Sequence, residues 1–167
     1  MAFFRFYKIQ LIPAPIEEVW DFISSPENLK KITPEKMGFK ITSGNLPEKM
    51  YPGIIISYTV KPVLGIRRIW VTEITHIEAM RYFVDGQLIG PYSMWHHQHF
   101  LELTENGVLM TDIVSYAPPL GFLGVIANFS FIKKQLKAIL SYPEKAIEKY
   151  FQITKSKKGT ELIKEPC

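Results

Sequence analysis

The sequence lacks most of the features that assign a protein to a class at first reading. Its only cysteine, Cys167, is the last of 167 residues, so no internal disulfide can form and a reducing compartment is expected. A nucleophile elbow, a P-loop, a dinucleotide fingerprint and a paired cysteine and histidine are all missing from the sequence. No class of enzyme is therefore indicated by a local motif.

Uninterrupted apolar runs are also scarce. Arg5 and Lys8 interrupt the N-terminal run, which is unlike the core of a signal peptide. The longest run, residues 117–132, contains two prolines and is too short to cross a bilayer comfortably. We therefore expect a cytoplasmic protein without stable membrane insertion.

The net charge of +4 is small, and its placement is uneven. Nine lysines and four glutamates lie in residues 121–167, so this segment carries the basic excess. An arginine-rich stripe and an aromatic RNA-binding signature are both missing, so we expect no nucleic-acid partner. The lysines are most simply explained as the solvent-exposed face of a helix and a polar tail.

Composition favours a single globular domain. Hydrophobic residues make up 47% of the chain and aromatic residues 13%, enough for a sizeable core. We place one domain at residues 1–153 and a polar C-terminal tail at 154–167. Nothing in the pattern indicates an oligomeric state.

The N-terminal residues predict a strand followed by two short helices. Alternation over residues 3–12 places Tyr7, Ile9 and Leu11 on one face of the strand. A helix then begins at the Ala-Pro pair that ends at Pro15, because proline fits the first helical position. The Ser-Pro-Glu sequence beginning at Ser25 starts the second short helix.

The remaining chain predicts six more strands and one long helix. The strands are expected at residues 37–43, 54–60, 66–77, 81–89, 92–104 and 108–117. The helix is expected at 122–151, with a kink or break at Pro143. Because strands do not alternate with helices, we predict an α+β fold whose seven-stranded antiparallel sheet curves around the C-terminal helix.

Two groups of motifs resemble a known superfamily. The first lies after the first strand, and the second spans the last two strands and the approach to the helix. They read Ala14-Pro15-x-x-x-Val19-Trp20, Ser25-Pro26-Glu27, Gly90-Pro91, Trp95-x-His97-x-His99, Thr111-Asp112-x-Val114-x-Tyr116 and Pro119-Leu120-Gly121. This pattern is similar to a small stand-alone bacterial subgroup of the SRPBCC superfamily, which includes START lipid-transfer domains, polyketide cyclase/dehydrase-like proteins and the birch-pollen allergen. The pair Tyr142-Pro143 departs from the Tyr-Arg of that pattern.

The resemblance implies a helix-grip fold with a hydrophobic cavity between the sheet and the C-terminal helix. It implies binding, transport or sequestration of a small hydrophobic, aromatic or amphipathic molecule such as a lipid. Two alternatives stay open. One is a polyketide cyclase/dehydrase-like enzyme that uses His97 or Asp85 as its acid/base. The other is a protein-interaction module with a filled core.

The hairpin at residues 105–108 predicts which side chains share a face. If Asn106-Gly107 forms a two-residue loop, Leu101 lies opposite Asp112 and His99 opposite Val114. His97 then lies opposite Tyr116. All these side chains share one face with Trp95, whereas a three-residue loop would break this grouping.

If this face lines the cavity, it gives an apolar wall with a few polar groups. We expect His97, His99 and Tyr116 to orient a polar ligand group while Trp70 and Trp95 stack on its apolar body. The opposing interpretation is that His99 and Asp112 satisfy each other inside the sheet. No residue is assigned as catalytic. The ligand-binding candidates are Trp70, Asp85, Gln87, Trp95, His97, His99, Asp112, Tyr116 and Phe129.

A metal site is not predicted from the sequence. His97 and His99 fall on one face, and Asp112 is available as a third ligand. This is only part of a ligand set, and the cavity of the superfamily is usually free of metal. We therefore expect no metal ion and no other cofactor.

Overall fold

The computed structural model describes residues 3–61 and 66–119 and single positions of the C-terminal segment. Those positions are Gly121, Gly124, Leu136, Tyr142, Ala146, Ile147, Tyr150 and Phe151. Most of the expected helix at 122–151, including Phe129, and the whole expected tail at 154–167 lie outside the described residues. The single long helix therefore stays a prediction.

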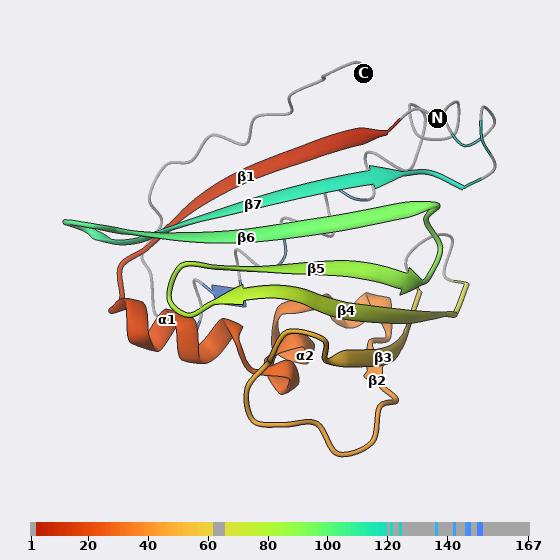
Figure 1. Ribbon diagram of the computed structural model, residues 1–167, viewed down its shortest axis with the longest axis horizontal. Coiled ribbons are helices and arrows are strands. Elements are labelled where there is room, and N and C mark those ends of the chain that lie inside the picture. The colour runs from red at the N-terminus through yellow and green to blue at the C-terminus, as the bar shows by residue number, and fades with distance from the viewer. Residues whose placement is uncertain are drawn as a thin grey trace.

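One antiparallel sheet of seven strands organises the described chain (Figure 1). Its order is β1-β7-β6-β5-β4-β3-β2, so the first and last strands of the chain are neighbours. The elements are β1 (Phe4–Ile12), α1 (Ile16–Ile23), η1 (Pro26–Asn28), α2 (Leu29–Ile32), η2 (Glu35–Met37), β2 (Lys40–Ile41), β3 (Ile55–Val60), β4 (Arg68–Glu78), β5 (Tyr82–Ile89), β6 (Met94–Thr104) and β7 (Gly107–Ala117). The expected sheet, with two short helices after its first strand, is confirmed.

The strand expected at residues 37–43 is mostly wrong. Residues Glu35–Met37 form a 3₁₀ turn, and β2 contains only Lys40–Ile41. The turn ends at Gly38, whose φ of 53° is left-handed and whose N–H donates to the carbonyl of Glu35. Glycine adopts this conformation at little cost, so the chain turns here instead of extending.

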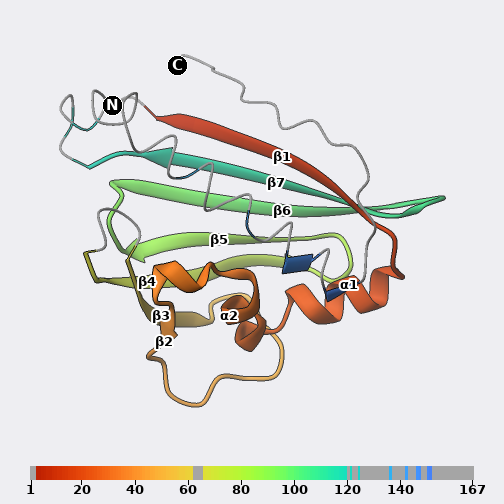
Figure 2. The ribbon, with the colours of Figure 1, turned by 180° about the vertical axis from the view of Figure 1, so that it is seen from behind.

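Helices α1 and α2 lie on one face of the sheet, as the front and back views both show (Figure 1, Figure 2). Helix α1 begins directly after Pro15 and buries Val19, Trp20, Phe22 and Ile23. Trp20 meets Phe83 of β5 edge to face, with ring centroids 6.4 Å apart. We call the face covered by these helices the inner face.

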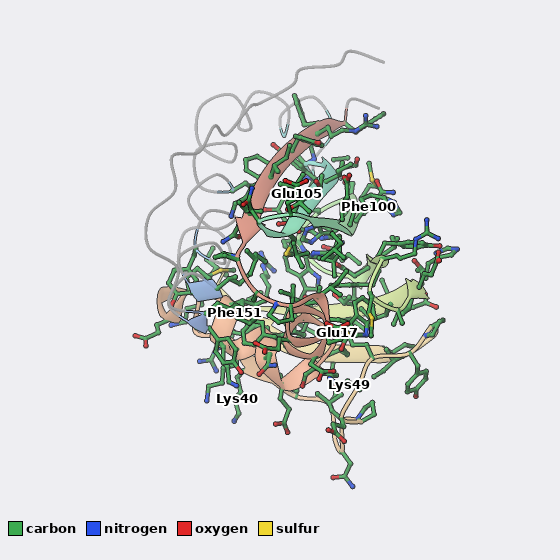
Figure 3. The ribbon with its side chains drawn as sticks, turned by 90° about the vertical axis from the view of Figure 1, so that its left-hand side faces the viewer. Glu17, Lys40, Lys49, Phe100, Glu105 and Phe151 are labelled. Carbon is green, nitrogen blue, oxygen red and sulfur yellow. The ribbon has the colours of Figure 1, made fainter. Side chains whose placement is uncertain are left out.

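Described residues of the C-terminal segment also pack on the inner face of the sheet and against α1. Phe151 lies beside α1 and packs against Phe22, with ring centroids 5.8 Å apart (Figure 3). Leu136 and Ile147 are also buried, at 4% and 1% exposure. Each belongs to a cluster of core residues contributed by the sheet. The inner face is therefore covered from both ends of the chain.

Strand β1 sends two polar side chains inward. Its buried face carries Phe6, Lys8, Gln10 and Ile12, and Lys8 and Gln10 are only 3% and 1% exposed. The opposite face, with Tyr7, Ile9 and Leu11, is only half-buried. The more polar face of β1 is thus the one turned toward the core.

The register of the β6–β7 hairpin differs from the prediction by two residues. The loop is Glu105-Asn106, and Thr104 lies opposite Gly107. The hydroxyl of Thr104 donates to the carbonyl of Gly107 at 2.8 Å, which fastens the turn. Gly107 has a φ of 122°, and a Cβ there would collide with the carbonyl oxygen of Ile12, so only glycine fits.

This shift changes the cross-strand pairs but keeps their face. His99 lies opposite Asp112, His97 opposite Val114, and Trp95 opposite Tyr116. The predicted pairs of Leu101 with Asp112, His99 with Val114 and His97 with Tyr116 are wrong. Because side chains alternate with a period of two, a two-residue shift returns every side chain to the same face.

Candidate functional site

A pocket of about 190 Å³ lies between the inner face of the sheet and helices α1 and α2. Strands β1 and β3–β7 all contribute side chains to its lining, together with Leu136 and Ile147. Most of the lining is apolar. The charged and imidazole groups gather on β1, β5, β6 and β7, and this distribution divides the pocket into two sides.

Strand pairing places four ionisable side chains together on one side. Asp85 of β5 lies directly opposite His97 of β6. On the next inward row, His99 lies opposite Asp112 of β7, which in turn lies opposite Lys8 of β1. We call Asp85, His97, His99 and Asp112 the Asp–His cluster. Its members come from three adjacent strands, so no short sequence motif contains it.

The two imidazoles lie between the two carboxylates. Asp85 Oδ2 is 3.4 Å from His97 Nδ1 and 3.2 Å from His99 Nε2. On the other side of the rings, Asp112 Oδ1 is 2.8 Å from His99 Nδ1 and 3.7 Å from His97 Nε2. The rings are 3.7 Å apart between centroids, and Phe83 stacks on the outer side of His99 at 4.0 Å.

The cluster shifts the pKa values of two of its members. Burial alone lowers the pKa of His99, but its contacts with Asp112 and Asp85 outweigh burial and raise the pKa to about 9. Burial raises the pKa of Asp112, but its contacts with His97 and His99 hold it well below the usual range. At neutral pH, His99 therefore carries a proton and Asp112 a negative charge.

Several buried polar atoms around the pocket have no aligned hydrogen-bond partner among the described residues. In the cluster they are His97 Nε2, His99 Nδ1 and Asp112 Oδ1. His99 Nδ1 and Asp112 Oδ1 are nevertheless only 2.8 Å apart and form an ion pair. The indole N–H of Trp70 is a fourth such atom. The indole N–H of Trp70 is the clearest case, because a buried donor without a partner costs about 1–3 kcal/mol, whereas the three cluster atoms face one another in ion pairs.

The other side of the pocket is aromatic, and we define the aromatic side as Tyr58, Trp70, Tyr92 and Trp95. Trp70 is at its centre, 6.1 Å from Tyr58, 5.7 Å from Tyr92 and 5.2 Å from Trp95 between ring centroids. Burial raises the pKa of both tyrosines well above the ordinary value of 10.0, and the charge of Asp85 adds to this at Tyr58. Both hydroxyls therefore stay protonated.

Six of the candidate residues line the pocket: Trp70, Asp85, Trp95, His97, His99 and Asp112. Gln87 does not, because its amide turns to the β5–β6 turn and donates to the carbonyl of Tyr92 at 2.8 Å. Tyr116 is buried beside the lining, with its ring 6.4 Å from Trp95 and 5.7 Å from Phe4. Phe129 lies outside the described residues.

The lining also contains residues that the sequence did not single out, among them Lys8, Tyr58 and Phe83. Lys8 and Tyr58 lie on opposite sides of the pocket, and Phe83 stacks on His99. The alternation of β1 and β3 could have placed Tyr58 inward. Lys8 gave no such signal, because a lysine in a strand is normally assigned to the solvent face.

Comparisons with known proteins identify the fold. No protein-family model matches the chain. No curated protein matches it either. Many solved structures do, at low sequence identity.

Three of these structures illustrate the similarity. The di-domain ARO/CYC protein StfQ of the steffimycin biosynthetic pathway has a TM-score of 0.68 at 11% identity, over 90% of this chain and 51% of that one. Ms6760 from Mycobacterium smegmatis gives 0.63 at 16%, over 92% and 93%. Ara h 8.0201 gives 0.56 at 16%, over 92% and 100%. The chain therefore shares the fold of these proteins, an ARO/CYC protein among them, as its motifs predicted.

Among the described residues, no helix is long and apolar enough to cross a membrane.

Proposed function

We propose that the protein binds a small hydrophobic or amphipathic molecule in the pocket between the sheet and the helices. The ligand's polar group points to the Asp–His cluster, and its apolar body lies on the aromatic side. The observation that carries the proposal is the buried indole N–H of Trp70, which lines a mostly apolar pocket and has no hydrogen-bond partner among the described residues. A ligand acceptor would satisfy that donor.

The composition of the pocket supports this proposal. Sites for small molecules are mostly apolar, with a few polar groups that fix the orientation of the ligand. Here the carboxylates and imidazoles are restricted to one side, and the aromatic side offers only indole and hydroxyl groups, which suits a molecule with one strongly polar end. The volume of about 190 Å³ favours a compact ligand, because sites for drug-sized molecules usually have about 300–1,000 Å³.

The structural neighbours support the same class of function. StfQ is an ARO/CYC protein of a biosynthetic pathway, and this chain shares its fold. At 11% identity this likeness concerns the fold, so the ligand of this chain is inferred from its own residues.

A second candidate function is an enzyme of the cyclase or dehydratase type. The observation that favours it is the pairing of imidazoles with carboxylates inside the pocket. A general acid and a general base can act there on one bound molecule. His97 and Asp85 are the acid/base candidates, because both line the pocket. This function predicts turnover of the bound compound and a rate that depends on pH.

The experiment is native mass spectrometry of the purified protein, followed by organic extraction and identification of any released compound. A bound lipid or aromatic compound supports the proposal and supplies a molecule to test for turnover. An empty protein whose melting temperature does not change with a broad lipid and aromatic panel contradicts it. That result would favour an interaction module with a filled core.

Matched tryptophan variants localise the binding. Trp70→Phe removes the unpartnered indole N–H and should reduce retention of the compound. Trp20→Phe is the control, because Trp20 is buried at 9% exposure but does not line the pocket. Equal retention by the two variants would place the ligand elsewhere.

A further inference from the structure

Three side-chain atoms of the Asp–His cluster converge on one point of the pocket wall. They are Asp85 Oδ2, His97 Nδ1 and His99 Nε2, and all lie within 4.8 Å of one another. The carboxylate oxygen is 3.4 Å from the first nitrogen and 3.2 Å from the second. The sequence pattern offers Asp112 as a third ligand, whereas the pairing of β5 with β6 supplies Asp85 instead.

Each of these two oxygen–nitrogen distances is the distance expected between two neighbouring ligands of one metal ion. Zinc binds imidazole nitrogen and carboxylate oxygen at about 2.0–2.1 Å, so adjacent ligands of a tetrahedral ion are about 3.3 Å apart. Two histidines and one carboxylate, with a further position free, are also the ligands of many iron(II) and catalytic zinc sites. The ligand type and the spacing therefore agree.

Asp112 lies where an outer carboxylate of a metal site is expected. A histidine that binds a metal usually directs its other ring nitrogen to a carboxylate, which fixes the ring and raises its basicity. Asp112 Oδ1 is 2.8 Å from His99 Nδ1 and 3.7 Å from His97 Nε2, the nitrogens turned away from Asp85. One carboxylate thus faces both rings, at hydrogen-bond distance from His99 and slightly beyond it from His97.

The surroundings suit a bound cation. The four side chains are only 11–15% exposed, and Phe83 and Trp95 flank the histidines. Lys8 is the other charged side chain among the described residues that line the pocket, and it lies opposite Asp112 in the strand register, on the side away from Asp85. Two carboxylates around two imidazoles concentrate negative charge, which either a proton or a divalent cation can neutralise.

We propose that Asp85, His97 and His99 bind one divalent transition-metal ion, with Asp112 as the positioning residue and the open coordination position facing the pocket. The ion is of the zinc or iron(II) class, because the ligands are imidazole and carboxylate. The open position accepts water or an oxygen of a pocket ligand. This proposal does not depend on the identity of that ligand.

The test is a cobalt(II) titration of untagged, chelator-treated protein, followed by visible absorption, with zinc(II) competition measured by calorimetry. We expect one cobalt(II) ion per chain, with the intense d–d bands of a four- or five-coordinate site, and displacement by zinc(II). The proposal is overturned if the wild-type protein shows no such bands. It is also overturned if zinc(II) added to the protein gives no more heat than zinc(II) added to buffer alone.

Variants separate this site from adventitious binding. Asp85→Asn and His97→Gln should abolish the bands, whereas His96→Gln should keep them, because His96 is exposed on the opposite face of β6. Asp112→Asn should keep the bands but weaken binding about 10- to 100-fold, as expected for an outer carboxylate. Bands that survive His97→Gln, or that disappear in His96→Gln, contradict the assignment.

The folding of each variant is checked by circular dichroism, and the wild-type titration remains decisive if one variant does not fold. The outcome is also independent of the proposed function. Metal binding can fail while an organic compound is still extracted, and the reverse result is equally distinguishable.

Discussion

The two sides of the pocket differ in how their residues depend on one another. On the aromatic side, Trp70 contacts three rings and is 7% exposed. Apolar burial and ring packing therefore stabilise this side of the pocket. On the other side, each member of the Asp–His cluster lies 2.8–3.7 Å from a carboxylate or imidazole of a neighbouring member. Shortening an apolar side chain removes only part of its stabilising contacts. Removing one partner of a buried ion pair leaves the other charge uncompensated, which costs more.

The largest expected effect on stability comes from removing one carboxylate of the Asp–His cluster, which makes up the ionic side of the pocket. Asp112→Ala leaves the imidazolium of His99 buried beside one carboxylate instead of two. We expect the free energy of unfolding to fall by about 3 kcal/mol, the lower end of the cost of breaking a buried ion pair. Urea denaturation in the presence of a chelator measures it. His96→Ala is the control and should change the value by less than about 0.5 kcal/mol, because His96 is exposed.

An Asp112→Ala variant as stable as the control would mean that the cluster contributes no net ionic stabilisation. The difference between the two sides would then disappear.

The next effect tests the turn that aligns the ionic side. Gly107→Ala forces a side chain into a φ of 122° and against the backbone of Ile12, so we expect a loss of about 2 kcal/mol in urea denaturation. Gly44→Ala is the matched control, because a Cβ at Gly44 meets nothing within 4 Å and should be nearly neutral. Equal stability of both variants would show that the hairpin tolerates another turn.

A smaller effect is expected for ligand recognition on the aromatic side. Trp70→Phe keeps a ring but removes the unpartnered N–H. The affinity for the fluorescent probe anilinonaphthalene sulfonate, whose sulfonate can accept that hydrogen bond, should fall about fivefold, equivalent to about 1 kcal/mol. Trp20→Phe should leave the affinity unchanged. A loss of equal size in both variants would indicate a general effect on folding.

The smallest effect is a pH dependence specific to the aromatic side. Burial raises the pKa of Tyr92 above the ordinary 10.0, so above pH 10 the unfolded chain ionises this phenol while the folded protein keeps it neutral. Stability from this group is therefore present below pH 10 and is lost as the pH rises above it. Tyr92→Phe should make the alkaline decline shallower in urea denaturation. An unchanged slope would show that the phenol ionises freely in the folded state.

Local patterns were sufficient to predict most of the fold. Alternation, proline and glycine gave six of the strands and both short helices close to their observed positions, because these signals act within a few residues. The segment at 37–43 failed because Gly38 allows a left-handed turn that apolar content alone does not reveal. The common face of Trp95, His97, His99 and Asp112 survived the wrong register, because the error was two residues and not one.

The cluster itself needed the three-dimensional pairing. The choice between Asn106-Gly107 and Glu105-Asn106 as the loop decides whether His99 meets Val114 or Asp112, and the sequence does not distinguish them. The convergence of Asp85 with both histidines depends on how β5 pairs with β6. Lys8 is inward because β1 turns its more polar face to the core, against the usual preference.

The most direct measurement of the central claim is the NMR response of the three tryptophan indole N–H groups to the compound released by extraction, or to anilinonaphthalene sulfonate. Each tryptophan occupies a different place: Trp70 and Trp95 line the pocket, and Trp20 does not. The account predicts that the indole resonance of Trp70 moves most, that of Trp95 moves less and that of Trp20 stays in place. A shift confined to Trp20, or no shift while the compound binds, would contradict a ligand site in this pocket.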